Sequence, residues 1–159
     1  MKIKHFKFYT EYNQFYLSSD NADFLNNIID FDSSSYKSRL KIEKNSLVIF
    51  TQSYGNIKGE IEILETSNTN IDYNKYDHIV EGGINIQSGK LKILDCPHIH
   101  KKLLLIVKPG KYRVRIYSSN LLTVKESDLV NETDNDYYRI ELWPSEDMKR
   151  KVLKQYEER

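Results

Sequence analysis

"KKLLLIVKPGKYRVRIY", residues 101 to 117, is the stretch that decides the fold class. Two strand-like runs flank Pro109-Gly110, a residue pair typical of a type II turn. In the second run, side chains two residues apart share one face of an extended chain. The apolar face carries Tyr112, Val114 and Ile116, and the opposite face carries Lys111, Arg113 and Arg115. The pattern therefore predicts a pair of β-strands joined as a hairpin, with one face in a hydrophobic core.

The same period of two recurs along the chain, with turn signals between the runs. Strands are predicted over residues 2–8, 13–17, 46–50, 58–64 and 137–143, and a second hairpin over 84–94 that turns at Ser88-Gly89. In the last strand, Tyr138, Ile140 and Leu142 form the predicted core face. We predict a single, predominantly all-β domain over residues 1–159: an antiparallel β-sandwich of about 8–10 strands, with a barrel as the alternative.

A C-terminal α-helix is predicted over about 145–157. Pro144 ends the preceding strand, and Ser145 is a suitable N-cap residue. Met148, Val152 and Tyr156 fall on one stripe at a spacing of four residues. Trp143, at the end of the strand, is expected to pack between the sheet and this helix.

Composition restricts the function. The chain has 159 residues, and 24 Lys and Arg residues against 23 Asp and Glu give a net charge of +1, so no basic excess indicates a nucleic-acid partner. A single cysteine, Cys96, favours a reducing compartment. No segment has the apolar length of a signal peptide core or a membrane span. We expect a soluble, cytoplasmic protein that binds neither membranes nor nucleic acid.

Two short clusters could carry chemistry. Cys96, His98 and His100 are potential zinc ligands, but Pro97 and the absence of a second ligand pair favour a solvated loop, and metal binding stays open. Asp77, His78 and Glu81 could form an acid/base site, although adjacent strand residues point to opposite faces. No nucleophile elbow or phosphate-binding glycine loop is present. We predict a protein without catalytic residues, metal or cofactor.

Acidic loops and tyrosines are the predicted partner-binding residues. Acidic patches accelerate association with basic partners, and tyrosines anchor protein interfaces. The alternative for each loop is ordinary solvation. The predicted residues are Asp20, Asp23, Asp30, Asp32, Tyr36, Tyr73, Tyr76, Asp128, Glu132 and Asp134.

The basic strand face has two interpretations. Lys111, Arg113 and Arg115, with Arg139 beside them, could contact phosphates. The alternative is a ladder with glutamates on neighbouring strands, such as Glu141.

Three stretches resemble one family of small bacterial proteins: "EYNQFYL" (11–17), "PGKYRVRIYSSNL" (109–121) and "DYYRIELWPS" (136–145). In this order they are similar to the competence protein J family, the DNA-entry nuclease inhibitors. The resemblance implies a β-rich, non-enzymatic inhibitor of a nuclease. We therefore expect an immunity or inhibitor protein that binds a basic nuclease-type toxin. The alternative is a small-ligand or carbohydrate-binding module in which Trp143 and exposed tyrosines stack on sugar rings.

Overall fold

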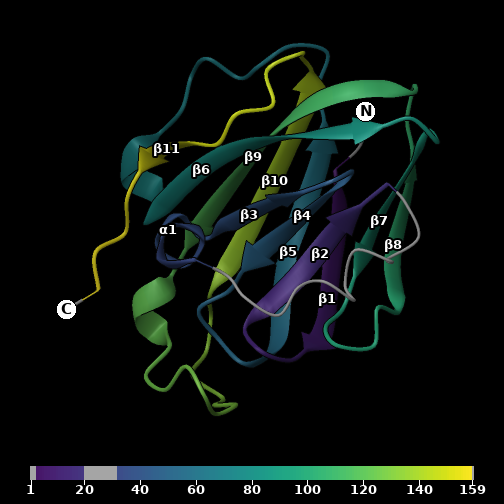
Figure 1. The fold of residues 1–159 in the computed structure, drawn as a ribbon. Coiled ribbons are helices and arrows are strands. Elements are labelled where there is room, and N and C mark those ends of the chain that lie inside the picture. The colour runs from purple at the N-terminus through teal and green to yellow at the C-terminus, as the bar shows by residue number, and fades with distance from the viewer. Residues whose placement is uncertain (1–2, 20–31, 159) are drawn as a thin grey trace.

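The computed structural model describes residues 3–19 and 32–158. This part of the chain is predominantly β and forms two sheets (Figure 1). The six-stranded sheet has the order β1-β5-β10-β9-β6-β11, and the five-stranded sheet has the order β3-β4-β2-β7-β8. The elements are β1 (Lys4–Thr10), β2 (Gln14–Ser18), α1 (Ser33–Ser38), β3 (Leu40–Glu43), β4 (Ser46–Phe50), β5 (Gly55–Ile63), the 3₁₀ turn η2 (Tyr73–Lys75), β6 (His78–Ile86), β7 (Lys90–Leu94), β8 (Lys101–Ile106), β9 (Gly110–Ser119), the 3₁₀ turn η3 (Leu121–Thr123), β10 (Tyr137–Pro144) and β11 (Lys151–Lys154).

One hydrophobic core contains side chains from both sheets. Tyr138, Ile140 and Leu142 of β10 have no exposed surface, which confirms the core face predicted for that strand. The ring of Phe15, on the other sheet, lies 6.3 Å from that of Tyr138 between centroids. Because fully burying such a side chain stabilises the fold by about 1.5–3 kcal/mol, the alternation of apolar residues determines which face of each strand turns inward.

The six-stranded sheet is mixed, so the prediction of a purely antiparallel fold is wrong at one pair. β10 runs parallel to β5, with Ile140 opposite Ile61, and antiparallel to β9. A parallel pair requires a long crossover connection, and here the chain forms β6 to β9 between the two strands.

Neither predicted hairpin forms. β6 and β7, which flank Ser88-Gly89, belong to different sheets, and so do β8 and β9, which flank Pro109-Gly110. Both bends exist: Gly89 adopts a φ of +71° and its amide donates to the Ile86 carbonyl at 3.2 Å, and the chain bends at Pro109 before Gly110, whose φ is +154°. The bends therefore carry the chain from one sheet to the other, because the strands find their partners among more distant segments.

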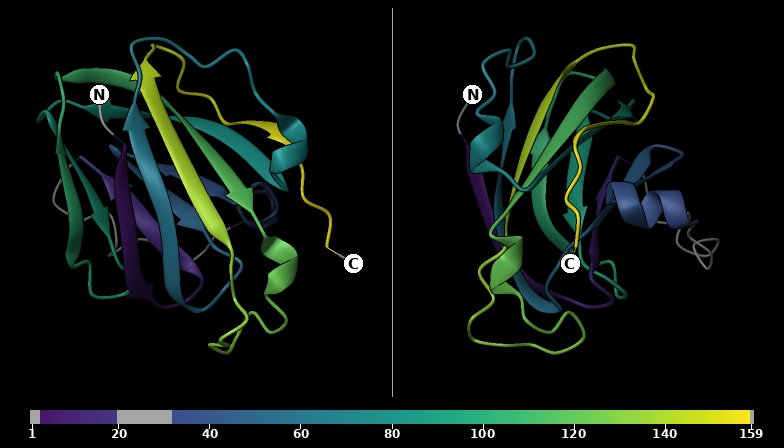
Figure 2. Two further views of the ribbon diagram at one scale, coloured as in Figure 1. Left: turned by 180° about the vertical axis from the view of Figure 1, so that it is seen from behind. Right: turned by 90° about the vertical axis from the view of Figure 1, so that its left-hand side faces the viewer.

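The predicted C-terminal helix is wrong. Residues 151–154 form β11, which pairs with the edge of β6, and the rest of the segment is not helical (Figure 2). The guanidinium of Arg113 donates to the carbonyls of Asp147 and Lys149, which a helix would use internally. The segment also passes close to Gly83, where a Cβ would lie 2.5 Å from the Met148 Cα. These backbone partners outweigh a narrow apolar stripe.

No helix in the described ranges combines the length and apolar character that crossing a bilayer requires.

Candidate protein-binding surface and groove

The structure places the predicted metal and acid/base residues apart. Cys96 is buried and accepts a hydrogen bond from Tyr16 at 3.2 Å, whereas His98 and His100 stack on each other at the surface. Within the described ranges, no group of three or more His, Cys, Asp or Glu side chains could hold a metal ion. His78 is fully buried, and Glu81 is bound to two arginines on the opposite face of β6.

The basic strand face is a ladder of ion pairs. Arg113 and Arg115 are both 5% exposed, and their Nε atoms lie 2.8 and 2.6 Å from the two carboxylate oxygens of Glu81. Arg139 bonds to Glu60, Glu62 and Glu141. Since bound glutamates satisfy these guanidinium groups, the ladder interpretation is confirmed for Arg113, Arg115 and Arg139.

Trp143 lies in the same layer. Its ring is 7% exposed and lies beneath the Arg115 guanidinium, 4.8 Å from the ring centroid. The packing partner is therefore an arginine, and the predicted contact with a helix does not form. A ring covered in this way has no free face for a sugar.

The predicted partner-binding residues lie on several elements. Asp20, Asp23 and Asp30 lie outside the described residues. Asp32 caps α1, where hydrogen bonds from Ser35 lower the pKa of its carboxyl to about 2. Tyr36 on α1 and Tyr73 on η2 are about half exposed, and the Tyr76 ring packs against the Tyr117 ring at a tilt of 42°. Asp128 and Glu132 are exposed, and Asp134 is partly buried and accepts from the Asn131 amide.

Three connections meet at one end of the molecule, which we call the loop end: residues 11–13, 51–54 and 120–136 (Figures 1 and 2). The Asn13 side-chain amide ties them together, because it donates to the carbonyls of Ser127 at 2.7 Å and Gln52 at 3.2 Å. Asp136, which is 2% exposed, accepts from the amide and hydroxyl of Ser53 and from the Tyr138 hydroxyl. The loop end is thus held by side chains from distant parts of the sequence.

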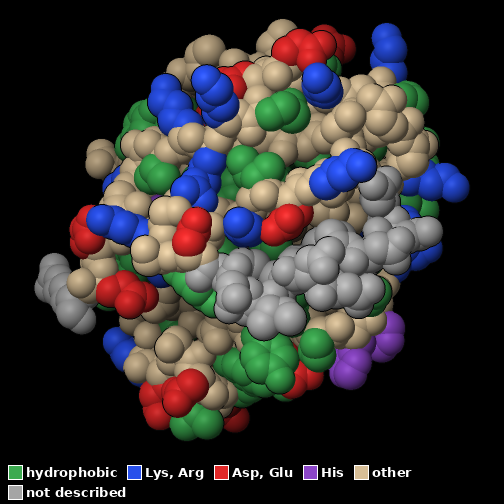
Figure 3. Space-filling model, viewed as in Figure 1, with side chains coloured by type: hydrophobic (Ala, Val, Ile, Leu, Met, Phe, Trp, Pro, Cys, Tyr) green, Lys and Arg blue, Asp and Glu red, His purple; other side chains and the backbone are tan. Residues whose placement is uncertain are grey.

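Exposed apolar side chains gather at the loop end, and we call them the apolar patch. They are Tyr9 (48% exposed), Tyr12 (65%), Leu129 (55%) and Val130 (53%). A Cβ at Gly55 would lie 2.5 Å from Val130 Cγ2 and 3.5 Å from Tyr9 Cε2, so the glycine lets β1 and the 120–136 loop approach each other. In the space-filling view, this end shows acidic side chains next to hydrophobic ones (Figure 3).

The apolar patch is not among the features predicted from the sequence. The signal available in the sequence was a pair of adjacent apolar residues, Leu129 and Val130, within an otherwise acidic loop. The approach of that loop to Tyr9 around Gly55 depends on tertiary structure and has no local signature.

A groove of about 1030 Å³ opens beside the loop end. Its lining comes from the turn after β1, from α1, from the end of β4 and from the C-terminal segment, and includes Tyr12, Asn13, Arg39, Gln52, Ser127 and Tyr156. Arg39 follows α1 with a φ of +63°, and its guanidinium lies 5.4 Å from the centroid of the Tyr156 ring. This distance is within the range of a cation–π contact.

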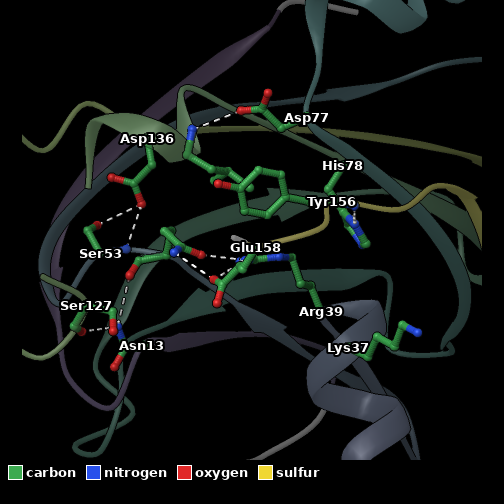
Figure 4. Close-up of polar contacts among 12 residues, drawn as sticks. Asn13, Lys37, Arg39, Ser53, Asp77, His78, Ser127, Asp136, Tyr156 and Glu158 are labelled. Atoms are coloured by element: carbon green, nitrogen blue, oxygen red, sulfur yellow. Dashed lines mark hydrogen bonds and ion pairs between the residues drawn. The ribbon is translucent and has the colours of Figure 1, made fainter. Parts of the chain in front are cut away.

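Arg39, Gln52 and Glu158 form a connected polar corner in the groove. Figure 4 shows the Arg39 side chain pointing toward Glu158. Arg39 Nη2 donates to Gln52 Oε1 and lies 3.4 Å from Glu158 Oε1. The Gln52 side-chain amide donates to the same Glu158 oxygen at 2.8 Å. The Oε1 atom of Glu158 therefore accepts from two donors, the charged Arg39 guanidinium and the neutral Gln52 amide.

His78 anchors the C-terminal segment behind this corner (Figure 4). Its Nε2 bonds to the Ser38 carbonyl at 2.7 Å, and its Nδ1 accepts from the Tyr156 amide at 3.0 Å. The ring must be neutral to do both. Burial, with the nearby Arg39 charge adding to it, lowers the pKa of His78 to about 4.

The sequence matches no family model and no curated protein. Two solved structures share the fold. ComJ from Bacillus subtilis, an inhibitor of the DNA-degrading activity of NucA, superposes with a TM-score of 0.66 at 13% identity, covering 91% of this chain and 100% of ComJ. The product of crocagin biosynthetic gene J superposes with a TM-score of 0.56 at 17% identity, covering 91% of this chain and 99% of the other. The chain has the fold of ComJ. At these identities the likeness concerns the fold.

Proposed function

We propose that this chain is a cytoplasmic immunity or inhibitor protein that binds a basic, nuclease-type toxin and blocks it without catalysis. The observation that carries the proposal is a fold shared over 91% of the chain with ComJ, which inhibits a DNA-degrading enzyme. The loop end supplies a surface suited to such a role, because it combines exposed aromatic and aliphatic side chains with carboxylates.

The two kinds of side chain have different tasks in this proposal. The apolar patch anchors the complex through Tyr9 and Tyr12, since tyrosine is enriched among the residues that contribute most to binding, and Leu129 and Val130 add apolar area that is buried on association. Asp128 and Glu132 at its margin attract a nuclease whose substrate-binding face is basic. The ties of Asn13 and Asp136 hold the loop in place before binding, which reduces the entropy lost on association. Blockage is steric.

The experiment is affinity capture from the native host with the purified chain, followed by a DNA-degradation assay on the captured nuclease. We expect a nuclease among the retained proteins, and its activity should fall to background at a molar excess of the chain. Retention of no nuclease, or an unchanged rate of degradation, would contradict the proposal.

Charge neutralisation tests the mechanism. The double variant Asp128→Asn, Glu132→Gln should slow association with the captured nuclease by up to roughly tenfold at low salt and weaken its salt dependence. The matched control is Glu65→Gln, Glu146→Gln, which removes two exposed charges away from the loop end. Equal association rates for the two variants in surface plasmon resonance would refute the electrostatic part.

A further inference from the structure

We infer that Arg39 and Gln52 form a carboxylate-binding subsite in the groove. The chain's own Glu158 occupies it here, and an acidic side chain on an extended segment of a protein partner takes its place on binding. The Glu158 carboxylate stands in for that group. It accepts hydrogen bonds from the Gln52 side-chain amide at 2.8 Å and from the Arg39 guanidinium at 3.4 Å. This inference depends on the groove alone and is independent of nuclease inhibition.

The subsite is fixed before any partner arrives. The Arg39 side chain is only 11% exposed, and its guanidinium packs on the Tyr156 ring. The Gln52 backbone is held at two points: its amide donates to the Tyr138 hydroxyl at 2.7 Å, and its carbonyl accepts from Asn13. Tyr138 is in turn bound to the buried Asp136. Donors fixed in this way bind a carboxylate with little loss of side-chain entropy.

Glu158 is a weakly held occupant. Its side chain is 63% exposed. Among the described residues, no hydrogen bond or ion pair uses its Oε2, or the Nη1 or Nε of Arg39. Exposed ion pairs contribute about 0–1 kcal/mol, so displacing Glu158 costs little. An incoming carboxylate can use the unoccupied arm of the guanidinium fork in a bidentate pair.

The charge of the subsite suits a carboxylate better than a phosphate. It combines one guanidinium with one neutral amide, and Glu157 lies nearby on the groove lining. Lys37 also lines the groove, but its side chain points away from Glu158 (Figure 4). The groove of about 1030 Å³ also includes Tyr12, Asn13 and Ser127 of the loop end in its lining. An extended segment can therefore continue from the subsite toward the loop end.

The test uses two small probes on the full chain: acetyl-Gly-Glu-Gly-amide, which carries one side-chain carboxylate, and acetyl-Gly-Gln-Gly-amide, which does not. NMR titration would follow the Arg39 Nε–Hε signal, assigned by its loss in Arg39→Lys. Glu158→Gln replaces the competing carboxylate with a neutral amide, which is a weaker competitor for the Arg39 guanidinium. Glu157→Gln is the matched control, because it removes a neighbouring charge that has no ion pair in the described part of the chain.

We expect the glutamate probe to shift the Arg39 signal saturably in Glu158→Gln, with a half-saturation concentration up to about fivefold below that of the wild type and of Glu157→Gln. The glutamine probe should leave the signal in place. Three results would overturn the inference: no shift in Glu158→Gln, equal shifts with both probes, or equal half-saturation in Glu157→Gln and Glu158→Gln. Because no nuclease is present, these outcomes are separate from the fate of the proposed function.

Discussion

Glu81 shows how a buried charge can determine the stability of a sheet. It is 7% exposed and bridges Arg113 and Arg115, which are equally secluded. Removing it leaves two buried guanidinium groups with fewer acceptors. We expect Glu81→Ala to lower the free energy of unfolding by about 3–5 kcal/mol.

The control for this prediction is Glu146→Ala. Glu146 pairs with Lys111 at 3.5 Å, but the two side chains are 87% and 46% exposed, so the loss should be at most about 1 kcal/mol. Urea denaturation of both variants measures the difference. Similar losses would show that the ladder on β9 behaves as ordinary surface charge.

Gly59 is a second residue whose role depends on its neighbours. In the middle of β5, a Cβ at this position would lie 2.0 Å from the Tyr138 carbonyl and 2.5 Å from the Phe6 ring. Gly59→Ala must push apart strands on both sides of β5, so we expect a loss of about 1–3 kcal/mol or more in the free energy of unfolding. Thermal denaturation monitored by circular dichroism would measure it. A variant as stable as the wild type would mean that the strands adjust freely.

The conformation of the C-terminal segment is set by contacts with other elements. Its apolar spacing suits a helix, yet it forms β11 and a tail that ends beside Arg39. Hydrogen bonds to the edge of β6, to the Arg113 guanidinium and to His78 all come from other elements. Intrinsic helix preference is a weak determinant, and tertiary partners override it.

His78 makes the attachment of this segment sensitive to pH. The pKa of His78 is lowered from 6.5 to about 4, so the folded state prefers the neutral ring. Its contribution is complete above pH 6.5 and is lost as the pH falls toward 4. We expect up to about 3 kcal/mol of pH-dependent stability over this range. A flatter profile of unfolding free energy against pH in His78→Gln would support this, and an identical profile would contradict it.

At the scale of the whole molecule, the two sheets share one core and should unfold together. Leu17 lies in the five-stranded sheet and Ile140 in the six-stranded one, and neither has exposed surface. We expect Leu17→Ala and Ile140→Ala each to cost about 2–5 kcal/mol. In both variants, Trp143 fluorescence and far-ultraviolet circular dichroism should report one coincident transition. Separate midpoints after either substitution would show that the sheets are independent units.

The sequence by itself determined most of the strands, with β3 and β11 as exceptions, and also the inward face of β10 and the arginine–glutamate alternatives, because side-chain alternation is a local property of an extended chain. It also contained the acidic character of the 120–136 loop. Tertiary structure alone decided that both tight bends change sheets, that β10 runs parallel to β5 and that residues 151–154 form a strand. Each of these depends on backbone partners tens of residues away. The loop end and the Arg39–Gln52 subsite are of the same kind, since Asn13, Gln52, Asp136 and Glu158 meet only in the folded chain.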